Sequence, residues 1–247
     1  MLVLVLSLSL LIGISLGLLG GGGSILTLPI LTYVAGVETK SAIASSLFVV
    51  AVTSGFGVIS HARAGRVQWR TGILFGLAGM AGAYLGGRLA KLIPGGVLMV
   101  LFAAMMVATA IAMLRGRKSG GPPRVGELPI GKVLLEGVIV GVVTGIVGAG
   151  GGFLVVPALV LLGGLAMERA VATSLVVISM KSFAGFYGHL QHVEIDWNTT
   201  LYVTGMAIVG SLVGGQLAGK IPPATLRRAF GWFVLVMAVV VLSKELL

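Results

Sequence analysis

Two clusters of glycine are the residues of this chain whose spacing most clearly suggests chemistry. Residues 20–23 are all glycine, and residues 148–152 hold four glycines around Ala149. A helix that begins at such a cluster has unpaired backbone N–H groups and a positive dipole end, which glycine lets an anion approach closely. We therefore expect a cradle for a small anion, with tight helix packing through small residues as the competing interpretation. The expected cradle residues are Gly21, Gly22, Gly23, Ser24, Gly150, Gly151, Gly152 and Phe153.

Lys181 is the most informative single residue. It lies about twelve residues into an apolar run that begins near Arg169, which is too deep for its ammonium group to reach water easily. All seven acidic residues are expected in loops or at helix ends, so the natural counter-ion of Lys181 is a bound anion. A neutral lysine that bonds to hydroxyls or carbonyls is the alternative.

Hydroxyl and imidazole side chains could complete such a site. The candidate hydroxyls are Ser45, Ser46, Thr53, Thr173 and Ser174, although hydroxyls more commonly cap backbone groups or join neighbouring helices. His61 and His189 could exchange protons near neutral pH and so couple transport to protons, whereas simple hydrogen bonding at the end of a span is the more frequent role.

The composition places these residues in a membrane. Of 247 residues, 57% are apolar and 10% charged, against about 25% charged in soluble domains. The absence of cysteine excludes disulfides, thiolate metal sites and thiol nucleophiles, and three histidines are too few for a rich metal site. We expect no cofactor, no metal and no nucleic-acid partner, because the net charge of +10 comes mainly from short loops between apolar runs.

The chain is an internal duplication with an offset of 128 residues. When residue i is laid on residue i+128, the glycine clusters, Pro29 and Pro157, and His61 and His189 coincide without a gap. Roughly a third of the positions between residues 17 and 94 are identical to their partners. The sequence therefore predicts a first repeat at 1–114, a linker at 115–132 and a second repeat at 133–247.

Each repeat begins with a glycine-broken apolar segment that is too long for one crossing. The segment 2–36 would form a helix of about 52 Å, whereas the hydrocarbon core is about 30 Å thick. It is either a helical hairpin that enters the membrane and returns or two short crossings. Three further spans follow in each repeat, near 41–60, 71–92 and 96–114 and near 169–188, 199–219 and 225–243.

Either form of the broken segment gives each repeat an odd number of net crossings, so the second repeat is inverted relative to the first. This topology places twelve Lys and Arg residues on one side and four on the other, and the basic side is expected to be cytoplasmic. Both termini then lie outside and the linker is cytoplasmic. The predicted fold is an all-α integral membrane protein with two inverted-topology repeats, each a glycine-broken hairpin plus three transmembrane helices.

The paired glycine–proline elements resemble a known family. The elements that end at Pro29 and Pro157, each followed by an Ala-x-Ser-Leu segment, look like those of the TauE/SafE sulfite exporters, also called the TSUP family. The resemblance covers essentially the whole chain. It implies a plasma-membrane transporter of small sulfur-containing anions such as sulfite, sulfoacetate, thiosulfate or other organosulfonates, and it leaves the direction of transport open.

These observations predict a secondary transporter that works by alternating access and binds an anion at the midplane between the glycine breaks. An anion channel and a non-transporting assembly partner are the alternatives. An enzyme is disfavoured, because no paired carboxylates or other acid–base set lie within the spans. The expected partners are the small anionic substrate and the lipid bilayer, and a homodimer is compatible with the sequence.

Overall fold

The computed structural model describes residues 2–115, 130–147, 152–190, 193–218 and 220–246, and every regular element in these ranges is a helix. The elements are α1 (Leu2–Leu19), α2 (Gly22–Pro29), η1 (Ile30–Val34), α3 (Thr39–Arg63), α4 (Trp69–Ala90), α5 (Gly95–Arg115), α6 (Ile130–Val147), α7 (Gly152–Pro157), η2 (Ala158–Leu162), α8 (Met167–Leu190), α9 (Trp197–Ala218) and α10 (Pro223–Leu246). The all-helical prediction is confirmed.

Six helices are long and apolar enough to cross a membrane: α3, α4, α5, α8, α9 and α10. Their bounds differ from the predicted runs by at most three residues at either end. Acidic side chains fix two of their N-termini, since Glu38 accepts a hydrogen bond from Ser41 N (3.1 Å) and Asp196 accepts one from Asn198 N (3.0 Å). Length and hydropathy therefore determine these spans, and local caps set where they begin.

The first glycine cluster breaks the N-terminal segment within the bundle. Helix α1 ends at Leu19, Gly20 turns the chain with a φ of 71°, and α2 starts at Gly22, with every residue of 20–25 buried. This left-handed conformation favours glycine, because a Cβ atom would clash with the backbone there. In the second half α6 ends at Val147 and α7 begins at Gly152, whereas the predicted cradle residues Gly150 and Gly151 lie outside the described residues.

Each returning arm contains a proline followed by a π-helical turn. Pro29 precedes η1 and Pro157 precedes η2, and the wide turns close with Ala35 N donating to Ile30 O and Gly163 N donating to Ala158 O, both at 2.9 Å. Proline lacks an N–H and crowds the carbonyl group four residues earlier, which disfavours a regular α-helix. The proline of each returning arm is therefore followed by a π-turn in both halves.

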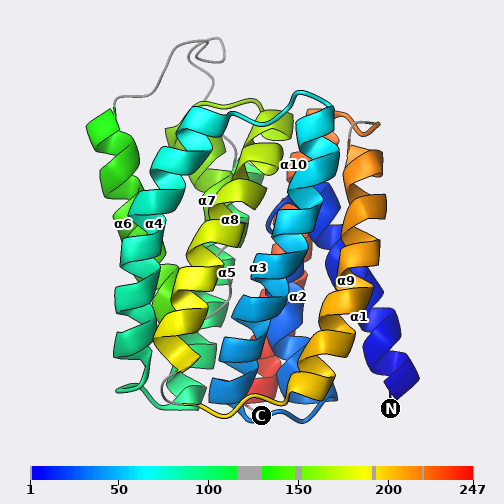
Figure 1. Cartoon of the computed structure of the whole chain (residues 1–247), viewed down its shortest axis with the longest axis vertical. Coiled ribbons are helices and arrows are strands. Elements are labelled where there is room, and N and C mark those ends of the chain that lie inside the picture. The colour runs from blue at the N-terminus through cyan, green and yellow to red at the C-terminus, as the bar shows by residue number, and fades with distance from the viewer. Residues whose placement is uncertain (1, 116–129, 148–151, 191–192, 219, 247) are drawn as a thin grey trace.

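Corresponding helices of the two halves run in opposite directions (Figure 1). In that view α1 rises from the lower end and α2–η1 returns to it, whereas α6 descends from the upper end and α7–η2 returns there. Helix α3 then runs upward and α8 downward. The chain turns inside the bundle at the first break, as a hairpin does, and these opposed directions accord with the predicted inversion.

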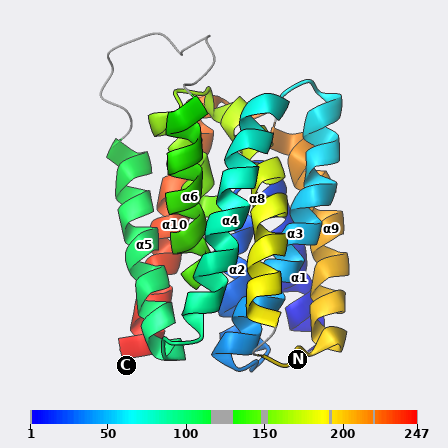
Figure 2. The same cartoon turned by 60° about the vertical axis from the view of Figure 1, so that its left-hand side comes forward.

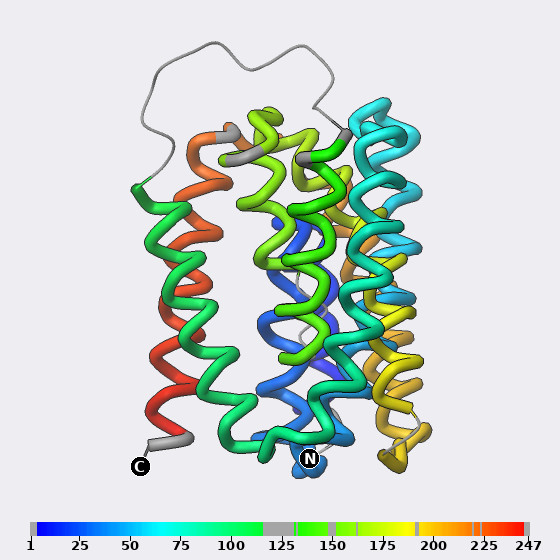
Figure 3. The backbone as a smooth tube through the Cα atoms, turned by 90° about the vertical axis from the view of Figure 1, so that its left-hand side faces the viewer, coloured from blue at the N-terminus to red at the C-terminus, as the bar shows by residue number. Residues whose placement is uncertain are grey.

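The packing contacts also recur at the 128-residue offset. A methyl group on Gly13 of α1 would overlap the backbone of Ala207 in α9, and one on Gly141 of α6 would overlap Gly79 in α4, which are the corresponding positions. Helix α1 of the first half therefore packs closely on α9 of the second half, and α6 of the second half packs closely on α4 of the first. Helices α3 and α8 form the buried centre, and α5 lies beside α10 at one side (Figures 2 and 3).

The two ends of the bundle differ in charge. Among the described residues, the upper end carries Arg63, Arg66, Arg70, Arg115, Arg169, Lys220, Arg227 and Arg228, and the lower end carries Lys40, Arg88, Lys91 and Lys244. The first turn of α1 and the last turn of α10 both lie at the less basic lower end (Figure 1).

Candidate functional site

The two glycine breaks contact each other inside the bundle. A methyl group on Gly21 would overlap the carbonyl group of Gly152, and one on Gly152 would lie 2.8 Å from Gly21 Cα. Ser24 is fully buried, donates to Gly21 O (2.8 Å) and lies beside the same contact. The structure thus brings together Gly21, Ser24 and Gly152, and their own backbone atoms fill the space between Gly21 and Gly152 in this conformation. Gly22 and Gly23 instead pack against Ser15 and Leu16 of α1, as the competing interpretation of tight helix packing predicts.

Phe153 does not face an open space. Its side chain is fully buried and packs edge-on against Phe102 of α5, with ring centroids 5.7 Å apart. This contact anchors the start of α7 through an apolar aromatic pair. Within the predicted site, Phe153 can therefore offer its backbone N–H to a ligand more readily than its ring.

Lys181 lies in the buried centre, with 1% of its surface exposed. Its Nζ donates to Thr144 Oγ1 (3.1 Å) on α6, and Thr144 donates onward to Gly141 O (3.2 Å). The aliphatic stem runs past Gly79 of α4, where a Cβ atom would lie 3.7 Å from Lys181 Cβ. No ion pair to Lys181 is found among the residues that the structure describes.

The end of α6 offers partial compensation for this cation. Thr144 belongs to the last turn of α6, where the helix dipole is negative, and that position favours a nearby ammonium group. Glu136 on the same helix is eight positions earlier, about 12 Å along the axis. The one hydrogen bond of Lys181 among the described residues goes to the Thr144 hydroxyl, a partner that fits a neutral lysine as well as a charged one.

Helices α3 and α8 cross at equivalent positions of the two repeats. Ser179 Oγ donates to Ala51 O (2.9 Å), and these two residues are partners at the 128-residue offset near the middle of each helix. Thr53 and Lys181 each follow the crossing by two residues. Thr53 Oγ1 and Ser54 Oγ are buried and have no hydrogen-bond partner among the described residues. Unpaired buried hydroxyls are costly and uncommon, so this position can offer hydrogen bonds to a bound group.

The other predicted hydroxyls bond to protein groups. Ser45 Oγ accepts from Thr200 Oγ1 and Thr173 Oγ1 accepts from Gln68 N, both at 3.0 Å. Ser46 donates to the carbonyl of its own helix three residues earlier (2.9 Å), and Ser174 does the same (2.7 Å). Ser174 also lies against the first glycine break, because a Cβ atom on Gly20 would be 2.6 Å from its hydroxyl.

The two predicted histidines form matching hydrogen bonds. His61 Nε2 donates to Gly17 O and His189 Nε2 donates to Gly145 O, each at 3.0 Å. In the first half Gly21 N bonds to Leu19 O, so it does not pair with the Gly17 carbonyl as it would in a continued helix. His61 therefore satisfies an end carbonyl of α1, and His189 reaches the equivalent carbonyl of α6. Both rings connect a central helix to a hairpin.

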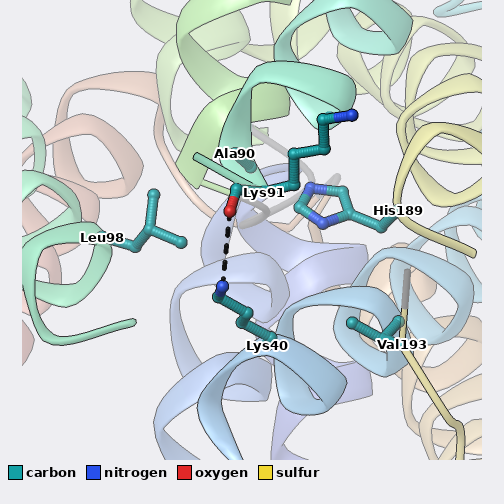
Figure 4. A pocket seen from close by; sticks show the side chains of 7 residues that line it. Lys40, Ala90, Lys91, Leu98, His189 and Val193 are labelled. Carbon is teal, nitrogen blue, oxygen red and sulfur yellow. Dashed lines mark hydrogen bonds between the residues drawn. The ribbon is translucent and has the colours of Figure 1, made fainter. Parts of the chain in front are cut away.

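A small pocket of about 40 Å³ lies at the lower end, and Lys40, Lys91 and His189 line it (Figure 4). Lys40 Nζ makes a long contact with Lys91 O (3.5 Å), which is the dashed line in that view. This pocket could hold a single water or a few atoms of a ligand. It brings two of the four basic residues of this end together.

A larger cavity of about 280 Å³ lies between α5, α6 and the arm α7–η2. Its lining is apolar apart from Thr109, and includes Ala108, Leu154 and Leu161. An anion would lose its hydration there without gaining donors. This cavity is therefore a poor candidate for an anion site.

Two partnerships were not anticipated from the sequence. Thr144, the partner of Lys181, is 37 residues away from it and corresponds to Leu16 in the first repeat, so neither spacing nor symmetry pointed to it. The ion pair between Arg66 and Glu168 (2.8 Å) was also missed. The repeat register could have revealed the latter, because opposite charges recur at the equivalent positions Glu194 and Lys40.

Comparisons with known proteins give consistent matches along the chain. The family described as "Sulfite exporter TauE/SafE" matches residues 5–241. A "Probable membrane transporter protein" of Xylella fastidiosa (strain 9a5c) is 33% identical over 95% of this chain and 92% of its own length. "Probable membrane transporter protein YdhB" of Bacillus subtilis is 27% identical over 89% of this chain and 91% of its own. No solved structure matches.

Proposed function

Because the chain belongs to the sulfite exporter TauE/SafE family of membrane transporters, we propose that it is a secondary transporter of small sulfur-containing anions across the plasma membrane. The family name points to sulfite, and the proposed class also includes sulfoacetate, thiosulfate and related organosulfonates, which the resemblance implied. The observation that supports an anionic substrate is the burial of Lys181 without an ion-pair partner among the described residues. Such a residue within a membrane usually marks a substrate or ion pathway.

The proposed anion site is the α3–α8 crossing. Lys181 supplies the charge from α8, where its side chain contacts α4 and α6, and the unpartnered hydroxyls of Thr53 and Ser54 on α3 are further candidate donors. The glycine breaks, through Gly21, Gly22, Gly23, Ser24 and the start of α7, supply close backbone approach once Gly21 and Gly152 separate. A planar or tetrahedral oxyanion accepts several hydrogen bonds, which fits donors arriving from several helices.

Alternating access follows from the two opposed hairpins. Each hairpin enters from a different end and packs against the other half, so movement of one half relative to the other would open one end while the other closes. The basic upper end is assigned to the cytoplasm and both termini to the outside, since short basic loops remain cytoplasmic. The chain is proposed to act without a cofactor and without catalysis.

The decisive test is ligand-induced thermal stabilisation of the purified protein with sulfite, thiosulfate, sulfoacetate, sulfate, phosphate and chloride, followed by counterflow in proteoliposomes. A ligand that binds only the folded state at 100 times its Kd adds about 2.7 kcal/mol of stability. We expect one or more sulfur oxyanions to stabilise the wild type and Lys220→Met, an exposed lysine control. We expect Lys181→Met to lose this response.

Different outcomes would replace the proposal by its alternatives. Conductance in planar bilayers without stimulation of flux by substrate on the opposite side would indicate a channel. A response to no anion on the panel, together with no flux, would favour an assembly role. Survival of the response in Lys181→Met would remove the lysine from the site while leaving the substrate class intact.

A further inference from the structure

The ion pair at the upper end has a counterpart of reversed charge at the lower end. Arg66 and Glu168, the upper pair, are joined at 2.8 Å. Adding 128 to Arg66 gives Glu194, and subtracting 128 from Glu168 gives Lys40, which we call the lower pair. Only seven of the 247 residues are acidic, and two of them belong to these pairs. In the repeat alignment, each of the two glutamates is matched with a basic residue.

The two pairs lie at equivalent places on opposite ends. Arg66 follows the end of α3 and Glu168 is in the first turn of α8, so the upper pair ties the α3–α4 loop to the start of α8. Lys40 is in the first turn of α3 and Glu194 precedes α9, so the lower pair would tie the α8–α9 connection to the start of α3.

The structure shows one pair formed and the other separate. Lys40 and Glu194 are both described, and no ion pair joins them. The Lys40 ammonium instead makes only its long contact with Lys91 O and lines the small pocket with His189 (Figure 4). Glu194 is exposed. Among the described residues, the upper pair is therefore formed and the lower pair is not.

Inverted repeats relate the two access states by exchanging the conformations of the halves. A contact between Arg66 and Glu168 in one state then corresponds to a contact between Glu194 and Lys40 in the other. We propose that the upper and lower pairs are alternating ion-pair gates, of which one forms when the other breaks. This inference rests on the proposed transport function and adds a specific pair of contacts to it.

The exposure of these pairs suits a switch. Glu168 has 43% of its side-chain surface exposed, and exposed ion pairs contribute little, so a gate of this kind can be exchanged without a large barrier. Removal of one pair should therefore shift the ratio of the two states by about two- to fivefold, and in opposite directions for the two pairs.

Disulfide cross-linking can test this directly, because the chain contains no cysteine. Lys40→Cys with Glu194→Cys reports the lower gate, and Arg66→Cys with Glu168→Cys reports the upper gate, in proteoliposomes treated with copper phenanthroline. We expect both double variants to cross-link. Lys40→Cys with Asp196→Cys is the matched control, because Asp196 is two residues from Glu194 but has no basic counterpart at its repeat position, which is Gln68.

The critical readout is reciprocity. Adding Arg66→Gln to the lower reporter should raise its cross-linking rate about two- to fivefold, while Arg63→Gln, an exposed arginine at the same end, should leave it unchanged. Adding Lys40→Gln to the Arg66→Cys and Glu168→Cys reporter should raise the cross-linking rate of that upper reporter, also by about two- to fivefold. If each substitution leaves the opposite reporter unchanged, or if the lower reporter does not exceed its control, the alternating-gate proposal is wrong.

This experiment separates the gates from the proposed substrate. Reciprocity between the reporters needs no ligand, so it can hold even if sulfite, thiosulfate and sulfoacetate have no effect on either cross-link. In that case the gates stand and the substrate class fails. Conversely, stabilisation by a sulfur anion without reciprocity would retain the transporter and discard the gates.

Discussion

Lys181 and Thr53 occupy the same position of the two repeats, and they differ in chemistry more than any other pair near the α3–α8 crossing. Lys181 is buried and donates a hydrogen bond to Thr144. Thr53 is buried and its hydroxyl has no partner among the described residues, and the first-half counterpart of Thr144 is Leu16, which offers no hydrogen bond. The backbone around them is shared, as the matching histidine bonds show. Duplication thus supplies a symmetric framework, and the lysine makes the two halves chemically different at this position.

The largest expected effect comes from erasing this difference. Lys181→Thr places in the second half the residue that the first half carries, and we expect uptake of the active sulfur anion to fall by on the order of 100-fold, because a buried charge partner is lost. Lys181→Arg, which keeps the charge, should retain a measurable part of the flux. The measurement is initial uptake into proteoliposomes.

Thr53→Lys in the Lys181→Thr background sharpens the comparison further. If the crossing is symmetric in function, the relocated charge should restore anion-induced thermal stabilisation in part. Restoration by Thr53→Lys but not by a lysine at the exposed position Asn198 would support the crossing as the site. Equal behaviour of the two double variants would argue against it.

Contact between the glycine breaks predicts a large structural effect. Gly21→Ala places a methyl group against the Gly152 carbonyl, and we expect it to destabilise the protein by ~3 kcal/mol, at the upper end for overpacked sites. Gly205 in α9 has open space around it, so Gly205→Ala should be neutral or slightly stabilising. Thermal unfolding in detergent would measure both, and similar melting temperatures would contradict the close contact.

The two histidines make the same hydrogen bond in the two halves, so their substitution should have similar effects. His61→Phe and His189→Phe each remove a donor from an end carbonyl, and we expect each to cost about 1–2 kcal/mol in thermal unfolding. The pH profile of flux should keep its shape in both variants if their role is to hold the hairpins. Loss of the pH dependence in either variant would support proton coupling through that ring instead.

The smallest expected effect concerns the starts of α4 and α9. Asp196 caps α9, and hydrogen bonds from the hydroxyl and N–H of Thr199 hold its pKa below the ordinary 3.8, whereas the equivalent Gln68 makes no side-chain cap bond. Asp196→Ala should lower the free energy of unfolding by about 1 kcal/mol, and Gln68→Asp should raise it by part of that amount.

The pH dependence of this cap has a defined sign. A lowered pKa in the folded state stabilises the fold above the ordinary pKa of 3.8, and the contribution is lost as the pH falls through the lowered value. Melting temperatures of the wild type and Asp196→Ala should therefore differ at pH 7 and converge only in strong acid. A constant difference down to pH 2 would show that the charge is not responsible.

The sequence was sufficient for the features that depend on local composition. The six spans, the break after Leu19 and the irregularity at Pro29 follow from hydropathy, glycine and proline alone. The partner of Lys181 and the contact of Gly21 with Gly152 depend on which helices become neighbours. Hydropathy does not encode that choice, because all of these surfaces are apolar or small.

The packing of α1 on α9 has a consequence for biosynthesis. Helix α1 is synthesised before α9, and its close partner in the bundle, through Gly13 and Ala207, follows almost two hundred residues later. Chains are made from the N-terminus at about 5–20 residues per second, so α1 must wait on the order of ten seconds or more for its partner. During that interval a short, glycine-ended helix depends on lipid or on the insertion machinery, and nascent chains truncated before α9 should be the forms most exposed to membrane proteases.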